Sequence, residues 1–133
     1  MSKNNLEDRL IDFAILVINI TEKIKKTYLG NYISNQLTRS GTSPALNYSE
    51  AESAESRKDF IHKLKIVLKE LRETHTGLRI TLRANLYQDN VHLQNVIDEN
   101  NELVAIFVSS VNTARKNQLS EKYEKTKKND IGK

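Results

Sequence analysis

Three long stretches of this chain repeat apolar residues at alternating intervals of three and four positions, which places those residues on one face of an α-helix. The stretches cover approximately residues 6–28, 56–86 and 91–118. In the middle stretch, the repeating positions are Phe60, Leu64, Val67, Leu71, Thr74 and Leu78. A helix with one apolar face has to bury that face against other elements, so the chain is predicted to be all-α.

The segment from residue 32 to residue 55 has a different composition, with Gly41, Pro44 and many small polar residues. In a helix interior, a proline costs about 3 kcal/mol and a glycine about 1 kcal/mol relative to alanine. Leu37 and Ala51 keep helical spacing on either side of the proline, so we predict a helix that is kinked near Pro44 and not broken. The small and special residues indicate a kink, a close helix contact or a recognition surface.

Short connections join the predicted helices, and short connections make consecutive helices antiparallel. The predicted fold is therefore an up-down-up-down antiparallel four-helix bundle in one domain, residues 1–118. Gly30 and Asn31 are typical of a helix C-terminus and are expected to end the first helix. Residues 119–133 lack a sustained apolar face and are predicted to form a frayed extension of the fourth helix and then a basic, disordered tail. The lysines of this tail are Lys122, Lys125, Lys127, Lys128 and Lys133.

The composition limits the cellular compartments and the binding partners that are expected for this protein. The chain has 133 residues and no cysteine, which excludes disulfides and thiolate metal sites. It has no apolar run of the roughly 20 residues that span a bilayer and no signal-peptide pattern at its start, so we expect a cytoplasmic protein without membrane contact. The net charge of +4 favours acidic partners, nucleic acid above all.

Some apolar residues lie beside the main helix faces. They are Ile15, Leu16, Val96, Leu103, Ile106 and Val108. They indicate either a subunit interface or a wider core stripe, and we expect a homo-oligomer. Asn100 is one polar residue in an otherwise apolar seam, and such a residue can set helix register or oligomeric state.

Candidate catalytic groups are few. Asp59 and His62 form a single acid-x-x-His pair, whereas carboxylate-bridged metal sites in bundles need several such ligands. Glu70 and Glu73 form a carboxylate pair on one helix face, which is more typical of an ion-paired surface, and a buried pair would need a cation such as Arg39 opposite. We therefore expect no metal, no cofactor and no catalytic residue, and hence a protein that is not an enzyme.

Basic residues accumulate along the third predicted helix and could contact phosphates. The candidates for nucleic-acid binding are Arg39, Lys63, Lys65, Lys69, Arg72, Arg79 and Arg83. Few aromatic residues lie between them, so base stacking is not indicated. A solvated lysine-rich face accounts equally well for this pattern.

The same region resembles the 23S rRNA intervening-sequence protein family, whose members are small bacterial four-helix bundles. The resemblance covers about residues 6–111. It is carried by Gln36-Leu37, Arg39, the run from Ser43 and Pro44 to Asn47, Glu50, Phe60, Glu70 and Glu73. We expect an oligomer or motif surface at these positions, formed by Gln36, Ser43, Pro44, Asn47, Tyr48, Glu50, Glu70 and Glu73.

The resemblance implies a ring-shaped homo-oligomer, a pentamer. A similar bundle serves as the accessory protein of diversity-generating retroelements, where a basic pentamer binds reverse transcriptase and nucleic acid. The expected function is therefore that of a non-enzymatic helical bundle that binds RNA, DNA or a nucleic-acid-processing partner such as a reverse transcriptase-like protein. A structural or protein-interaction scaffold without a nucleic-acid role is the alternative.

Overall fold

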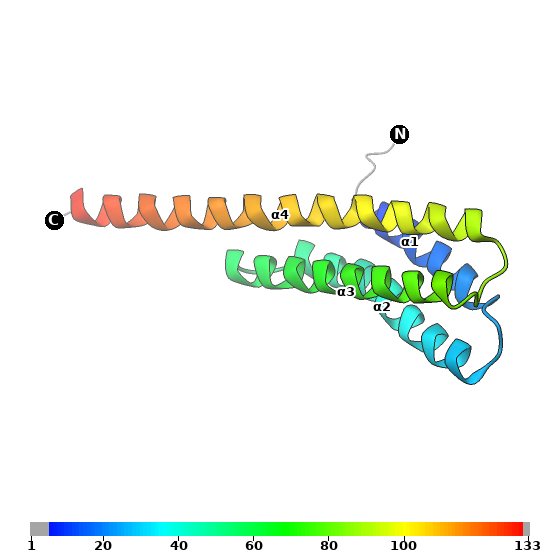
Figure 1. Cartoon of the computed structure of the whole chain (residues 1–133). Helices are drawn as coiled ribbons and strands as arrows, with labels where there is room; N and C mark the ends of the chain where they lie inside the picture. Colours follow the sequence, from blue (N-terminus) through cyan, green and yellow to red (C-terminus); the bar gives the residue numbers. More distant parts are fainter. Residues whose placement is uncertain (1–5, 132–133) are drawn as a thin grey trace.

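The computed structural model describes residues 6–131, which form four α-helices (Figure 1). These are α1 (Leu6–Thr21), α2 (Tyr28–Glu52), α3 (Arg57–Arg83) and α4 (Asn90–Ile131). Each helix packs against the next in the chain, and α1 also packs against α4, so that the four helices surround one core. The predicted all-α four-helix bundle is confirmed.

The core is built from the apolar seams that the sequence predicts. Phe13, Leu37, Leu71 and Phe107 come from the four helices in turn, and none of them exposes more than 1% of its surface. Burial of each such side chain contributes about 1.5–3 kcal/mol, which outweighs the weak intrinsic preference of any one helix. None of the helices among residues 6–131 is long and apolar enough to cross a membrane.

The junction between the first two helices differs from the prediction. α1 ends at Thr21, and α2 begins at Tyr28 with the Thr27 hydroxyl accepting a hydrogen bond from the Gly30 backbone N–H at 3.0 Å. Gly30 therefore lies in the first turn of α2 and does not end α1. A Cβ atom at Gly30 would lie 1.9 Å from the Lys25 carbonyl oxygen, so this glycine permits a close backbone approach.

α2 continues through Pro44 without a break, and its small residues serve close helix contacts. A Cβ atom at Gly41 would lie 2.7 Å from a Val17 methyl carbon, so glycine lets α2 approach α1 closely. On another side of α2, the buried Ser40 hydroxyl lies 2.9 Å from the Thr74 hydroxyl of α3. A close helix contact thus explains these residues, while the kink at Pro44 and the complete up-down-up-down order stay predictions.

The helical extension of the fourth helix is longer than expected, since α4 runs to Ile131 and projects beyond the other helices (Figure 1). Extending an existing helix avoids the cost of nucleation, and Glu121–Lys125 and Glu124–Lys128 have the four-residue spacing that favours a helix. Lys133 lies outside the described residues. We call residues 118–131 the α4 arm.

Most of the apolar residues beside the main seams widen the core. Val96 and Leu103 are buried, and Leu16, Ile106 and Val108 are partly buried, whereas Ile15 is exposed. Asn100 is fully buried, and its side-chain amide donates to the Leu71 carbonyl of α3 at 3.2 Å. This bond links α4 to α3 at a defined position, and a role of Asn100 in oligomeric state stays a prediction.

Candidate nucleic-acid interface

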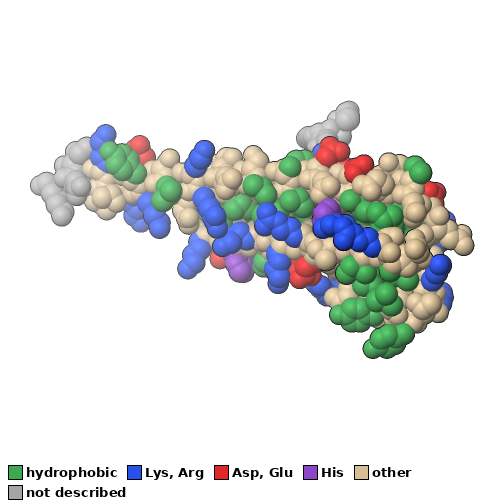
Figure 2. All heavy atoms as spheres, viewed as in Figure 1, with side chains coloured by type: hydrophobic (Ala, Val, Ile, Leu, Met, Phe, Trp, Pro, Cys, Tyr) green, Lys and Arg blue, Asp and Glu red, His purple; other side chains and the backbone are tan. Residues whose placement is uncertain are grey.

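One face of α3 carries a row of basic side chains along its whole length. Their spacings of three, four and seven residues keep them on the same face of the helix. We call this set the basic stripe; it consists of Lys58, Lys65, Lys69, Arg72, Arg79 and Arg83, all of them exposed. Figure 2 shows Lys and Arg side chains following α3 across the molecule. At about 1.5 Å per residue, the stripe is about 37 Å long.

The cations of the basic stripe form no ion pair within the described part of the chain, and Lys69 has a weaker attraction, to Glu73. The ion pairs of residues 6–131 use other cations, namely Arg9, Arg39, Arg57 and Lys63. Neighbouring like charges on a helix repel each other, so the stripe slightly destabilises the protein in isolation. An unmatched row of exposed cations is suited to binding a polyanion.

Arg39 occupies a different environment, in the contact between α2 and α3. Its guanidinium donates to Glu70 at 2.7 Å and to Glu73 through its other terminal nitrogen. These bonds, that to Glu73 foremost, raise the pKa of Arg39, and the bond from Arg39 is the main reason why the pKa of Glu73 is lowered. Glu70 is only 6% exposed and thus depends on this cation.

Lys63 is also paired, because its ammonium group binds the Glu50 carboxylate of α2. The structure therefore divides the seven predicted phosphate-binding residues into two groups. Arg39 and Lys63 join α3 to α2. The other five lie together on the exposed face of α3; they are Lys65, Lys69, Arg72, Arg79 and Arg83.

Several residues of the predicted motif surface make contacts inside the chain. Pro44 is buried, and the Tyr48 ring meets the Phe107 ring of α4 edge-on at a centroid distance of 5.6 Å. The Asn47 amide donates to the Ser43 carbonyl at 3.0 Å, within α2. Gln36 is exposed. Most of this motif therefore has a packing role in the bundle.

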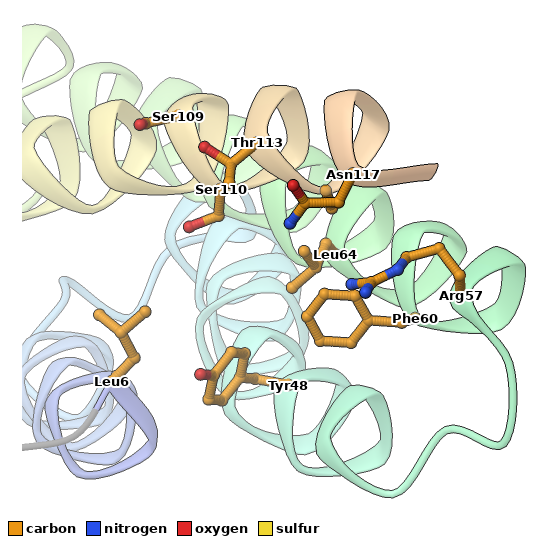
Figure 3. A pocket seen from close by; sticks show the side chains of 10 residues that line it. Leu6, Tyr48, Arg57, Phe60, Leu64, Ser109, Ser110, Thr113 and Asn117 are labelled. Carbon is orange, nitrogen blue, oxygen red and sulfur yellow. The ribbon is translucent and has the colours of Figure 1, made fainter. Parts of the chain in front are cut away.

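Tyr48 also borders a concave surface of about 370 Å³ between the helices (Figure 3). Phe60 and Leu64 contribute apolar groups, and Arg57 lies over the Phe60 ring at 6.0 Å. Burial, and to a smaller extent Glu52 and Glu7, raise the pKa of Tyr48. The α4 side supplies hydroxyl and amide groups, from Ser109, Ser110, Thr113 and Asn117. The lining residues include no carboxylate, imidazole or thiol, so they offer mainly hydrogen-bonding groups, with the Tyr48 phenol among them.

The imidazole and carboxylate groups do not gather elsewhere in the described residues either. No three of the His, Asp and Glu side chains in residues 6–131 are arranged to hold a metal ion. Asp59 and His62, the nearest match to a ligand pair in the sequence, are both exposed at the start of α3.

A second concentration of positive charge lies where α4 passes the start of α3. Arg115 and Lys122 of α4 border the same groove as Lys58 and Lys65 of the basic stripe. Arg115 was not among the predicted phosphate-binding residues, and Lys122 was assigned to the C-terminal tail. Only the packing of α4 on α3 brings these residues to the stripe, and no local sequence signal shows that packing.

Comparison with known proteins identifies the type of bundle. A family model of the 23S rRNA-intervening sequence protein matches residues 3–109. The chain belongs to the 23S rRNA-intervening sequence protein family. No curated protein matches it.

A solved structure has the same fold as this family member. It is the crystal structure of a protein of unknown function from the S23 ribosomal protein family of Bacteroides thetaiotaomicron. The two chains are 32% identical with a TM-score of 0.74, over 80% of this chain and 98% of the other. The family match includes the whole basic stripe and ends before Arg115, so the α4 arm lies beyond the matched part of the chain.

Proposed function

We propose that this member of the 23S rRNA-intervening sequence protein family is a non-enzymatic, cytoplasmic nucleic-acid-binding protein that contacts phosphates through the basic stripe. One observation carries the proposal: six exposed Lys and Arg side chains share one face of α3 and form no ion pair within residues 6–131. Phosphates would supply the counter-charge that the bundle itself does not.

The chemistry of the stripe favours backbone recognition over base recognition. Phosphate contacts carry no sequence information, and reading or stacking on bases requires side chains that reach base edges or aromatic rings. Phe60 is the one Phe, Tyr or Trp between Lys58 and Arg83, and it borders the concave surface beside Tyr48 and is not part of the stripe. We therefore expect binding that is nearly independent of sequence and falls steeply with salt.

The test compares two variants that lose the same charge. Lys65→Gln, Lys69→Gln and Arg72→Gln together remove three stripe cations, while Lys23→Gln, Lys25→Gln and Lys26→Gln remove three exposed cations at the α1–α2 junction. Fluorescence anisotropy with labelled RNA and duplex DNA gives the affinity at several salt concentrations. The stripe variant should bind at least about tenfold more weakly, with a salt slope that is reduced by about 3 on duplex DNA, and the junction variant should change little. Equal losses, or no binding by the wild type at low salt, would contradict the proposal.

We also propose that the protein is a homo-oligomer, with the pentamer suggested by the resemblance as the first stoichiometry to test. Ile11 and Ile15 of α1 are 45% and 51% exposed. Tyr28, Leu29 and Tyr32 add an exposed apolar cluster at the start of α2 (Figure 2). Such surfaces mark interaction sites and also support the second candidate function, a protein-interaction scaffold.

Light scattering tests the assembly directly. A pentamer has five times the chain mass of 15.3 kDa. Ile11→Lys with Ile15→Lys should lower the mass without changing helicity, because both side chains are already exposed. A wild-type monomer would contradict the oligomer, and an oligomer that ignores nucleic acid at low salt would favour the scaffold.

A further inference from the structure

The groove between α3 and α4 combines cations from two helices. Lys58, His62 and Lys65 come from the first turns of α3, and Arg115 and Lys122 come from α4. Ile61 and Gln118 complete the lining, and the volume is about 460 Å³. The lining residues include no carboxylate.

Two acids lie next to lysines of this groove in sequence, and neither of them lines it: Asp59 follows Lys58, and Glu121 precedes Lys122. The Glu121 carboxylate accepts a hydrogen bond from Arg57 at 2.8 Å. Lys58 is the second residue of α3, so the positive end of the helix dipole adds to the potential here. Four Lys and Arg side chains line the groove, and they outnumber Asp59, the acid beside Lys58 that forms no ion pair among residues 6–131.

The two helices also present their cations in matching steps. Arg115 and Lys122 are seven residues apart, as are Lys58 and Lys65, and seven residues are two helical turns of about 5.4 Å each. A chain of phosphates in the groove would thus be flanked from two sides, whereas the rest of the basic stripe contacts it from one side. Two-sided contact excludes more water and strengthens each charge–charge interaction.

We propose that this groove is the anchor site for the phosphodiester backbone, from which the bound strand continues along the basic stripe of α3. The inference rests on the proposed nucleic-acid function and deepens it. It assigns phosphate-binding roles to Arg115 and Lys122 and gives the α4 arm a function at its base. Gln118 and His62 are placed to donate further hydrogen bonds to phosphate oxygens.

The test compares two double variants of α4, each of which loses two positive charges. Arg115→Gln with Lys122→Gln removes the cations that α4 contributes to the groove. Lys116→Gln with Lys127→Gln removes the same charge from the same helix, but 116 and 127 lie on a different face and do not line the groove. All four side chains are exposed, so both variants should retain the wild-type circular dichroism spectrum.

Affinities for single-stranded RNA, duplex DNA and inorganic polyphosphate are then measured by anisotropy and by competition. The groove variant should lose at least about tenfold in affinity for each of the three ligands, and its salt slope on duplex DNA should fall by about 2. The control variant should lose less than about threefold. A loss with the nucleic acids alone would assign the site to the sugar–phosphate backbone in particular, and a loss with all three would assign it to phosphate chains in general; either supports the anchor.

Two results would overturn the inference, and they differ in what else they overturn. Equal losses in the two α4 variants, with normal weakening in the Lys65/Lys69/Arg72 variant, would reject the anchor and leave the proposed function intact. A wild-type protein that binds none of the three ligands at low salt would reject both.

Discussion

The two long faces of α3 differ in whether their cations are paired with carboxylates. On the face that packs against α2, Arg39 joins Glu70 and Glu73, and Lys63 joins Glu50, so cations and carboxylates are matched. On the face with the basic stripe, the cations form a row with no ion pair among the described residues.

This difference separates charges that hold the bundle together from charges that are available to a partner. A cation with a buried carboxylate beside it stabilises the fold, and its removal leaves an unpaired charge. A solvent-exposed cation among like charges contributes little to folding and stays available to an anionic partner. Substitutions on the two faces should therefore change the free energy of unfolding by different amounts and even in opposite directions.

The largest loss of stability is expected on the face of α3 that packs against α2, which we call the paired face. Arg39→Leu leaves the buried Glu70 carboxylate without its cation, and we expect a loss of about 1–3 kcal/mol in the free energy of unfolding, because Arg39 itself is half exposed. Urea denaturation measures this loss. Arg72→Leu is the matched control on the basic stripe and should stay within about 0.5 kcal/mol of the wild type; similar losses at the two positions would remove the distinction.

A smaller loss of stability is expected from removing a hydrogen bond between two uncharged side chains. The Thr74 hydroxyl is buried, 2.9 Å from the Ser40 hydroxyl and 2.8 Å from the Glu70 carbonyl. Thr74→Val keeps the shape but leaves Ser40 without this partner, which should cost about 1–2 kcal/mol. Thr76→Val changes an exposed threonine on the stripe face of the same helix and should be nearly neutral. Thermal unfolding measures the stability of both variants. If Thr74→Val were as stable as the wild type, the hydrogen bond between Thr74 and Ser40 would contribute little.

The paired face should also respond to pH. Arg39 lowers the pKa of Glu73 in the folded protein, so Glu73 contributes stability that is present above its unfolded pKa and lost as pH falls through the folded pKa. The stability difference between the wild type and Arg39→Leu should therefore be larger at pH 7 than at pH 3. A difference that stays constant between these two pH values, in urea titrations, would contradict a role for the ionised carboxylate.

The smallest change in the free energy of unfolding should be an increase, and it is expected on the basic stripe. Arg79 has Arg83 four residues after it and no acidic residue three or four positions away, and such a like-charge pair costs about 0.2–0.5 kcal/mol. Arg79→Gln should thus raise the free energy of unfolding by a few tenths of a kcal/mol while it weakens nucleic-acid binding. If Arg79→Gln destabilised the protein, the stripe would have a structural role that the contacts do not show.

The local pattern of the sequence was sufficient for the helices and for much of the core. Spacings of three and four residues identify Leu64, Leu71 and Leu78 as buried, because a helix repeats its faces at that period. The end of α1 was misjudged because Gly30, a common helix terminator, here relieves a close backbone approach. The length of the helix in the α4 arm was underestimated because apolar periodicity indicates burial, and an arm that projects from the bundle buries little.

The candidate site was predictable only in part. Residues on one helix face follow from spacing, so Lys65, Lys69, Arg72, Arg79 and Arg83 were identified together. Whether a cation is paired depends on residues that are distant in sequence, as with Arg39 and Glu70, and whether a groove forms depends on where α4 crosses α3. The sequence by itself therefore determined the helices, their buried faces and the row of basic residues. Only the tertiary structure decided which cations are neutralised and which converge, because both depend on distances between helices and not on the order of residues within one.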